Sequence, residues 1–579
     1  MPDVAAARPA SARPASSRPA PSRLDPVTLE ILFNALRGIT DETFIALMRT
    51  AYSTNIKERH DHSTVIMDAD GRLVVQADGS LPIHLASMLG LMRCLLAKVG
   101  KDGIRPGDIF VANDPHVAGG THLPDINLAM PVFGDGDLLG FVCNIAHHAD
   151  VGGMVPGSMA GGMSEIYQEG LRIPVVRLFA GGTLQQDVMD ILLLNMRLPE
   201  ERRGDLNAQI AACRLGAARL QELWQKHGTA RLSQAFDQIV ARTAQRMRQA
   251  IARIPNGVYR FEDVMDDDGM GAKDIPIRLA ITVGEGGIHF DFAGSSPQVR
   301  GNINLTLNAT QSAVCYALKA LLDPEVPNNQ GVLDAFTIAA PSGSLLNCQA
   351  PAPVAARAHT CQRVIDVVIG ALAPVLPAAA VAAANGANTT AVFAGTDPRT
   401  GRAYVYFETL GGGFGGRADR DGKDGVQVHI TNTSNLPIEA IEMEYPLQVV
   451  RYGLVEDSGG AGTWRGGMGL RREVKPVGHA CTFNGAGERF THQPWGIFGG
   501  EPGASGRFLL RTGNGAEQPL DNKPAGVSIA PSDSVVVETP GAGGYGPPSG
   551  RSAEALAADA RGGKFSAAYR RRYYGSATS

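Results

Sequence analysis

The chain has 579 residues, of which 44% are hydrophobic and 19% charged, and its formal net charge is −4 at pH 7. This length exceeds that of a single small core, so we expect two or more packed units or one large body. Acidic and basic residues are interspersed, and this pattern argues against a nucleic-acid-binding protein and against a membrane-surface patch.

The seven cysteines never form a Cys-x-x-Cys pair. This argues against a disulfide framework and against a thiolate zinc site, and it favours a reducing cytoplasm. The N-terminus lacks the apolar stretch of a secretory signal, and we expect no run long enough to cross a membrane. We therefore expect a cytoplasmic protein without a membrane partner.

Residues 1–24 are rich in Arg, Pro, Ala and Ser and almost free of acidic residues. Such a composition cannot build a core, so we expect a disordered tail. Residues 25–255 follow as a predicted N-terminal α+β part. Apolar residues recur there at helical spacing near residues 26–39, 83–99 and 199–254. Short Val-, Ile- and Phe-rich runs alternate with glycine turns, as strands do, over residues 63–77 and 108–146.

Residues 256–550 are rich in Gly and Pro, and we predict a β-dominated part with helices near residues 310–322 and 361–376. The glycine run at residues 411–416 lacks a following Gly-Lys-Ser/Thr and an apolar helical stripe, so we interpret it as a tight structural turn near a site. The chain has no convincing ATP-binding motif. Residues 551–579 are predicted as a helical C-terminal tail. The predicted fold class is α+β, a large mixed body with several core helices.

The densest chemistry lies in two short stretches, residues 113–125 and 145–153. His122 and Asp125 are three residues apart around a proline, a spacing that lets both side chains converge in a tight loop, and His147 ends an apolar run. Two His and one carboxylate form a recurrent ligand set for a divalent metal with open positions. Each His alone is more often a solvated or hydrogen-bonded side chain, but neighbouring glycine pairs permit close backbone approach.

We expect two other reactive side chains, those of His84 and Cys361, to have structural rather than catalytic roles. His84 begins a helical stretch, and we expect it to satisfy local hydrogen bonds rather than to bind a ligand. Cys361 lies at an expected helix start, where we interpret it as a buried small hydrophobe rather than a nucleophile.

Motifs in chain order make the sequence resemble the hydantoinase B/oxoprolinase family over about residues 25–575. The motifs are PGDIF (106–110), NDP (113–115), GGTHLPD (119–125), HHADVGG (147–153), DP (323–324), PNNQG (327–331), ETLGGG (408–413), NT (432–433), PIE (437–439), DSGGAG (457–462), RGG (465–467), PWG (494–496) and PGAGGYG (540–546). The family includes B subunits of ATP-dependent hydantoinases, the second half of 5-oxoprolinase and a subunit of acetone and acetophenone carboxylases.

The resemblance implies a division of labour between two subunits. A separate A-type subunit uses ATP to phosphorylate a carbonyl or enolate oxygen of the substrate. The B-type subunit, to which this chain is similar, holds a divalent metal, for which we expect Zn, Mn or Fe. This would explain the missing phosphate loop, and it implies a hetero-oligomer with the A-type partner.

Carried over residue by residue, the resemblance implies metal ligands at His122, Asp125 and His147, with Asp61 as a fourth. An Asp before a strand is also a common cap or turn residue, so that alternative stays open for Asp61. Beyond the resemblance, we interpret His148 as a catalytic group that moves a proton and Asp150 as a carboxylate that supports a ligating imidazole.

These features together predict a subunit of an ATP-dependent cyclic amidohydrolase acting on a hydantoin, oxoproline or similar lactam. One alternative is a subunit of an ATP-dependent ketone carboxylase. The chain length is closer to stand-alone hydantoinase B subunits than to the acetone carboxylase subunit, and this favours hydrolysis. Another alternative is a non-catalytic partner that only scaffolds the A-type subunit, which would not need a metal centre.

Overall fold

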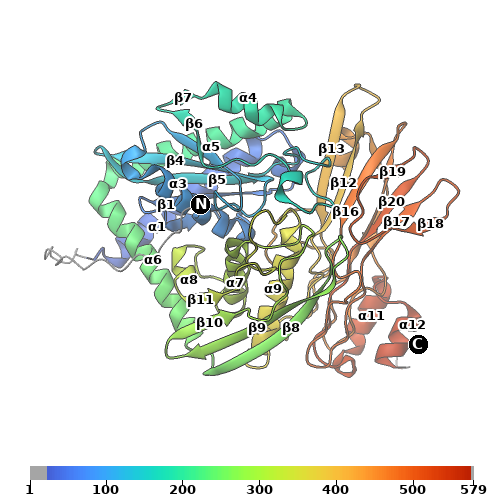
Figure 1. The fold of residues 1–579 in the computed structure, drawn as a ribbon. Helices are drawn as coiled ribbons and strands as arrows, with labels where there is room; N and C mark the ends of the chain where they lie inside the picture. Colours follow the sequence, from blue (N-terminus) through green and yellow to red (C-terminus); the bar gives the residue numbers. More distant parts are fainter. Residues whose placement is uncertain (1–22, 576–579) are drawn as a thin grey trace.

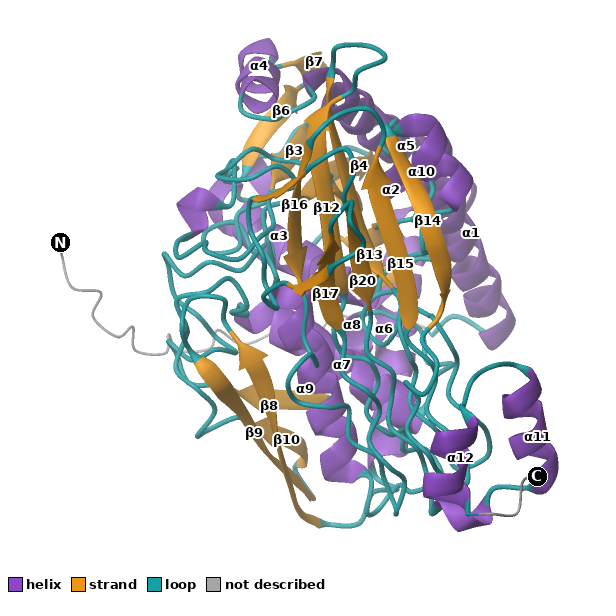
Figure 2. Cartoon of the chain, turned by 90° about the vertical axis from the view of Figure 1, so that its right-hand side faces the viewer, coloured by secondary structure: helices purple, strands orange, loops and turns teal. Residues whose placement is uncertain are grey.

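The computed structural model describes residues 23–575. The predicted tail at residues 1–24 therefore lies outside the described part, apart from its last two residues. Four β-sheets and the helices between them make up the fold (Figures 1 and 2). This mixture confirms the predicted α+β class.

The first sheet carries the strands on which the site is built. Its seven strands lie in the order β2-β1-β5-β4-β3-β6-β7, and all neighbours are antiparallel. Their bounds are β1 His62–Asp68, β2 Leu73–Gln76, β3 Ile109–Ala112, β4 Asp125–Gly134, β5 Asp137–His147, β6 Val176–Ala180 and β7 Thr183–Leu184. Strands β4 and β5 form a long hairpin at its centre.

Helices cover both faces of this sheet. One face packs on α1 (Pro26–Thr50), α4 (Gln186–Leu194), α5 (Pro199–His227) and α6 (Thr229–Ile251). The other face packs on α3 (Leu85–Val99), which follows the short 3-10 helix η1 (Pro82–His84). The sequence predicted the start of α1, where the Asp25 side chain accepts a hydrogen bond from the Thr28 amide.

The segment Pro82–Val99 corrects one expectation. It is the one described stretch long and apolar enough to cross a membrane on length and composition alone. In the fold its helix lies against the first sheet, and Met88, Leu91, Met92 and Leu95 are completely buried. Its apolar side chains therefore serve the protein core.

The second sheet lies on the far side of two central helices. Its order is β11-β10-β9-β8, with bounds β8 Gly257–Asp267, β9 Lys273–Gly284, β10 Gly287–Asp291 and β11 Phe336–Ala339. The helices α7 (Leu307–Leu322) and α9 (Arg357–Leu372) lie between this sheet and the first (Figure 1). All residues of α9 are buried, so its N-terminus is fixed inside the protein.

Two further sheets form the C-terminal side of the molecule (Figure 2). One has the order β13-β12-β16-β19, with β12 Thr389–Thr396, β13 Ala403–Leu410, β16 Cys481–Ala486 and β19 Val527–Ile529. The other has the order β14-β15-β20-β17-β18, with β14 Leu447–Leu454, β15 Leu470–Pro476, β17 Arg507–Arg511, β18 Glu517–Pro519 and β20 Ser534–Glu538. The remaining elements are α2 Thr54–Lys57, η2 Lys101–Gly103, η3 Ile166–Gln168, α8 Gln330–Leu333, α10 Ile438–Glu444, η4 Pro548–Gly550, α11 Ala553–Arg561 and α12 Ala567–Tyr574.

The glycine-rich motifs pack backbone against backbone. The Gly416 amide donates to Gly543 O, and the Gly467 amide donates to Phe414 O. A Cβ added at Gly415 would lie 1.8 Å from Ala382 O, so only glycine fits there. The run at residues 411–416 is therefore structural, but it forms no turn, which corrects the predicted tight turn, and its glycines serve close chain packing.

The largest hydrophobic cluster contains residues from both sides of the predicted division at residue 255, from Val65 to Ile430. The N-terminal part and the β-dominated part thus share one core. The boundaries at residues 255 and 550 remain predictions from sequence composition.

Candidate metal centre

The first sheet brings His122, Asp125 and His147 together. Asp125 begins β4 and His147 ends β5, and the two are direct cross-strand partners, which places both side chains on one face. His122 lies three residues before Asp125. One ligand atom from each residue lies within 4.8 Å of the others, and all three side chains are buried. The structure thus joins the three residues that the sequence singled out.

Two ligand atoms of this cluster have no hydrogen-bond partner among the described residues. His122 Nε2 and Asp125 Oδ1 lie 3.1 Å apart, yet neither makes a hydrogen bond within the described chain. His122 Nδ1 lies 3.0 Å from Ala355 O, which can only accept, so Nδ1 carries the proton and Nε2 presents its lone pair. Buried polar atoms without a partner are costly. A cation between the lone pairs would remove that cost, so the residues fit a divalent metal.

Electrostatics keep this ligand set ready for a cation. Burial lowers the pKa of His122, helped by the Arg357 guanidinium, and burial lowers the pKa of His147 well below its usual value. Both imidazoles are therefore neutral. Burial opposes ionisation of Asp125, but the pKa of its carboxyl still lies well below the usual range, and with neutral imidazoles the permanent positive charge of Arg357 is the cause. Two neutral imidazoles beside one carboxylate are the forms that bind metal.

Arg357 fixes the orientation of the Asp125 carboxylate. It is the first residue of α9, and its guanidinium donates to Asp125 Oδ2 and, over 2.8 Å, to Thr121 Oγ1. This leaves Asp125 Oδ1 free to face His122. No sequence motif pointed to Arg357, because α9 is distant in sequence and meets β4 only in the folded protein.

Asp61 and His84 lie beside the three central residues. The His147 amide donates to Asp61 O over 3.0 Å. His84 Nε2 lies 3.8 Å from Asp61 Oδ1 and 3.6 Å from Asp125 Oδ1. Its Nδ1 has the expected local hydrogen bond, to Ser63 Oγ at 2.8 Å. The interpretation of His84 as only locally bonded therefore missed that its other nitrogen faces two carboxylates.

These side chains line a cavity of about 30 Å³, which has room for an ion or a water but not for a lactam. The Phe407 ring stacks on His147 at 4.9 Å, and the Asn55 amide lies 3.0 Å from His147 Nδ1. The rest of the wall comes from Leu81, Ile83, Met159, Ala358, Asn388, Thr409, Thr431 and Thr433.

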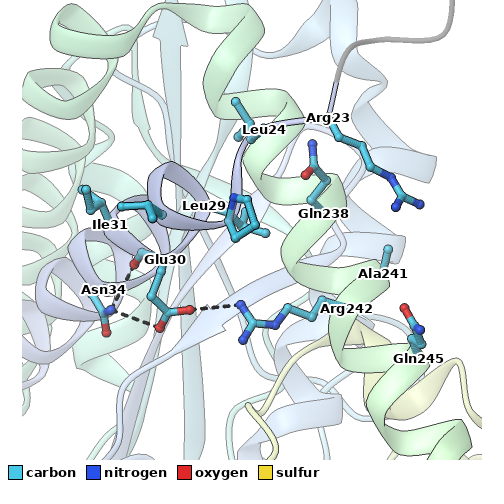
Figure 3. A pocket seen from close by; sticks show the side chains of 12 residues that line it. Arg23, Leu24, Leu29, Glu30, Ile31, Asn34, Gln238, Ala241, Arg242 and Gln245 are labelled. Carbon is cyan, nitrogen blue, oxygen red and sulfur yellow. Dashed lines mark hydrogen bonds and ion pairs between the residues drawn. The ribbon is translucent and has the colours of Figure 1, made fainter.

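A larger hollow, of about 950 Å³, lies elsewhere, between α1 and α6 (Figure 3). Its charged side chains include Glu30 and Arg242, which pair with each other at 3.0 Å. Glu30 is the one residue with a metal-ligand side chain among those that line this hollow.

His148 lies on the other face of the sheet from His147. Side chains along a strand alternate between faces, and Ile145 and His147 share the face that packs on α3. The Asn144 amide reaches Gln209 O on α5, and His148 Nε2 lies 3.0 Å from Gln209 Oε1. His148 does not line the cavity, whereas His84 does. His84 is therefore better placed than His148 to move a proton at this centre.

Asp150 is also directed away from the cavity. Its carboxylate accepts hydrogen bonds from the amides of Gly152, Gly157 and Arg197, and from the Arg197 guanidinium at 3.0 Å. These contacts fix the loop after β5. We predicted that Asp150 supports a metal-binding imidazole, but the group that holds the candidate ligand His122 is the Ala355 carbonyl.

Cys361 is completely buried in α9, and burial raises the pKa of its thiol to about 12. A thiol in this environment stays protonated, which agrees with its interpretation as a small hydrophobe.

Glu169 positions the carbonyl that holds His122. Its Oε1 accepts hydrogen bonds from the amides of Val354 and Ala355, both at 2.7 Å, and burial raises the pKa of this carboxyl to about 8. We expect Glu169→Ala to weaken binding of a divalent metal by roughly 10- to 100-fold, as loss of an outer-shell partner typically does. Glu169→Gln keeps an oxygen that accepts both amides and should bind as wild type. Competition with a chromogenic chelator measures both, and wild-type affinity in a folded Glu169→Ala variant would refute this role.

A family model described as hydantoinase B/oxoprolinase matches residues 25–548. The chain belongs to this family. A protein from a Pseudomonas species, named as the putative B-type subunit of a D-/L-hydantoinase, is 32% identical over 550 residues, covering 92% of each chain. 5-oxoprolinase 1 of Arabidopsis thaliana is 36% identical over 552 residues, which are 90% of this chain and 42% of that larger protein. The resemblance found in the motifs is therefore confirmed.

Two solved structures have a similar fold. An ATP-dependent caprolactamase from Pseudomonas jessenii superposes with a TM-score of 0.90 and 30% identity, over 95% of this chain and 96% of that one. A nucleotide-free acetone carboxylase superposes with a TM-score of 0.87 and 21% identity, over 95% and 79% of the two chains. The second likeness shows a shared fold only.

Proposed function

We propose that this hydantoinase B-type chain is the metal-holding subunit of an ATP-dependent cyclic amidohydrolase. The observation that supports the proposal most is the buried cluster of His122, Asp125 and His147, in which His122 Nε2 and Asp125 Oδ1 lack a hydrogen-bond partner. Family relatives named as hydantoinase and caprolactamase subunits point to hydrolysis of cyclic amides. We infer a cytoplasmic location, as the sequence suggested.

The side chains of this centre have separate tasks. His122, Asp125 and His147 would hold a Zn, Mn or Fe ion, with Asp61 as a candidate fourth ligand, and a bound ion supplies Lewis-acid chemistry for attack on an activated amide. Arg357 keeps one Asp125 oxygen occupied and the other free. His84 Nε2 faces both carboxylates, where it can hold or pass a proton.

ATP would be used in an A-type partner, which is consistent with the structural role of the glycine run at residues 411–416. A planar amide is a poor electrophile, so phosphorylation of its oxygen in the partner would prepare it for attack by water. Transfer of a labile intermediate requires sites that exclude bulk water, and a stable hetero-oligomer would meet this need. The proposed substrate is a hydantoin, 5-oxoproline or another lactam.

A ketone carboxylase is the second candidate, and the fold that the chain shares with acetone carboxylase favours keeping it. The two reactions differ in their second reactant. We expect the co-purified complex with an A-type subunit to open a lactam ring at an unchanged rate after bicarbonate is removed, because hydrolysis needs only water. A panel of hydantoin, 5-oxoproline and caprolactam, with product measured by liquid chromatography, tests this. Strict dependence on bicarbonate, with label from bicarbonate carbon in the product, would replace the hydrolase with the carboxylase.

A further inference from the structure

One buried cation beside the metal cavity has no anionic partner in contact. Arg59 lies shortly before β1, and its side chain is completely buried. Within residues 23–575 its guanidinium has no carboxylate oxygen within 4.0 Å. Each of the other arginines that are buried in this part of the chain has one; they are Arg202, Arg357, Arg363, Arg465, Arg472, Arg489 and Arg551. Arginine is rarely withdrawn from water without such a pair, so Arg59 is the exception that needs an explanation.

Neutral groups hold the Arg59 guanidinium, and two of them line the metal cavity. It donates to Asn55 Oδ1, to Thr409 Oγ1 and, over 3.3 Å, to Thr433 Oγ1. Thr409 and Thr433 belong to the wall of the cavity. Neither of these hydroxyls donates a hydrogen bond to another described residue. Because each hydroxyl oxygen accepts from Arg59, its hydrogen is available for an acceptor inside the cavity.

The strand that carries Thr409 also contacts a candidate metal ligand. Residues two apart on a strand share a face, so Phe407 and Thr409 of β13 point the same way. The Phe407 ring stacks on His147 at 4.9 Å. This contact places the face of β13 that carries the Thr409 hydroxyl against the candidate metal centre.

The charges around the cavity favour an anion when the centre holds a divalent ion. Two carboxylates lie in the wall, those of Asp61 and Asp125. Even when both are ionised, the guanidiniums of Arg357 and Arg59 balance them. A bound divalent ion then leaves a net positive charge in a buried place. Hydroxyl donors backed by a buried cation are suited to an oxygen that carries negative charge.

We propose that the hydroxyls of Thr409 and Thr433, backed by Arg59, bind an anionic oxygen of the substrate beside the metal. The two hydroxyls would contact that oxygen, and Arg59 would act through them as a positioning residue. The cavity of about 30 Å³ has room for such an oxygen. In the proposed function the phosphoryl group of the activated amide carries anionic oxygens, so this choice of substrate rests on that function.

Calorimetric titration of the full-length chain, purified with its metal, tests this site with formate, a small oxyanion. We expect Thr409→Val and Thr433→Val to bind formate at least tenfold more weakly than wild type, because each loses a hydrogen bond to a charge. Thr409→Ser keeps the hydroxyl and should bind as wild type. Wild-type affinity in either valine variant, or no binding by wild type, would overturn the proposal.

Thr431→Val is the matched control. Thr431 lines the same cavity, but its hydroxyl already donates to Val428 O over 3.1 Å, so formate binding should be unchanged. A loss in Thr431→Val as large as that in Thr409→Val would indicate a general effect on the cavity and would overturn the proposal.

Two further measurements separate the anion from the metal and from the reaction. Elemental analysis should find equal metal content in wild type and Thr409→Val, and loss of the metal from this variant would overturn the proposal. Formamide resembles formate without its charge and should bind wild type at least tenfold more weakly, whereas equal affinity would overturn the anion site. Lactam ring opening by the wild-type complex would still support the proposed function after such a failure, because that assay does not depend on formate binding.

Discussion

His147→Ala should abolish tight binding of a divalent metal, whereas His148→Ala should leave it intact. The two histidines are neighbours in sequence and chemically identical, but β5 directs them to opposite faces of the sheet. In the proposed centre His147 supplies one of three protein ligand atoms, and its loss would leave an undersaturated site. We expect a loss greater than the roughly 10- to 100-fold that removal of an outer-shell partner causes.

The measurement is elemental analysis of both variants after purification without chelator, followed by chelator competition. His148→Ala controls for the general cost of removing a buried imidazole from this strand end. Equal metal content in the two variants, or loss only in His148→Ala, would contradict the ligand assignment.

Arg357→Met should destabilise the metal-free protein strongly. The guanidinium is 4% exposed and the carboxylate of Asp125 is completely buried, so this change leaves a buried charge without its main partner. Breaking a buried ion pair from one side costs about 3–5 kcal/mol. A lower midpoint in denaturant unfolding of the metal-free chain measures this loss.

A double variant separates charge from packing. Arg357→Met combined with Asp125→Asn removes both charges, so we expect it to recover a large part of the stability lost in Arg357→Met, because coupled partners are not additive. If the double variant is instead as unstable as the sum of the two single variants, the pair does not act as a charge pair and this account of Arg357 fails.

The three central residues could be predicted because the signals that place them are local. His122 and Asp125 are three residues apart before a strand, and a hairpin returns His147 to pair with Asp125. The same strand also explains the misplacement of His148. We placed His148 at the site because it follows His147 directly in the sequence. Side chains alternate between the two faces of a strand, and this alternation along β5 predicts that the two imidazoles lie on opposite faces.

Arg357 and His84 were missed for a different reason. Arg357 is 232 residues from Asp125 and reaches it only because α9 is buried between two sheets. His84 lies in a 3-10 turn before an apolar helix, a context in which an unpaired His is usually structural. Tertiary packing brings both side chains to the site, and no spacing of residues in the sequence predicts this packing.

The C-terminal glycine motifs were recognised as family features before their role was evident. Gly415 and its neighbours allow segments far apart in sequence to pack main chain against main chain. From composition we predicted turns at these glycines. The close packing of distant backbone segments could not be predicted, because it depends on partners that are far away in sequence.

The central claim is that the cluster of His122, Asp125 and His147 is a metal centre used to open cyclic amides. The most direct measurement is ATP-dependent ring opening by the complex with an A-type subunit, assayed with wild-type, His147→Ala and His148→Ala chains under identical conditions. The account predicts a ring-opened product with wild type and His148→Ala, and none with His147→Ala. Ring opening that persists in metal-free His147→Ala at the wild-type rate would contradict it.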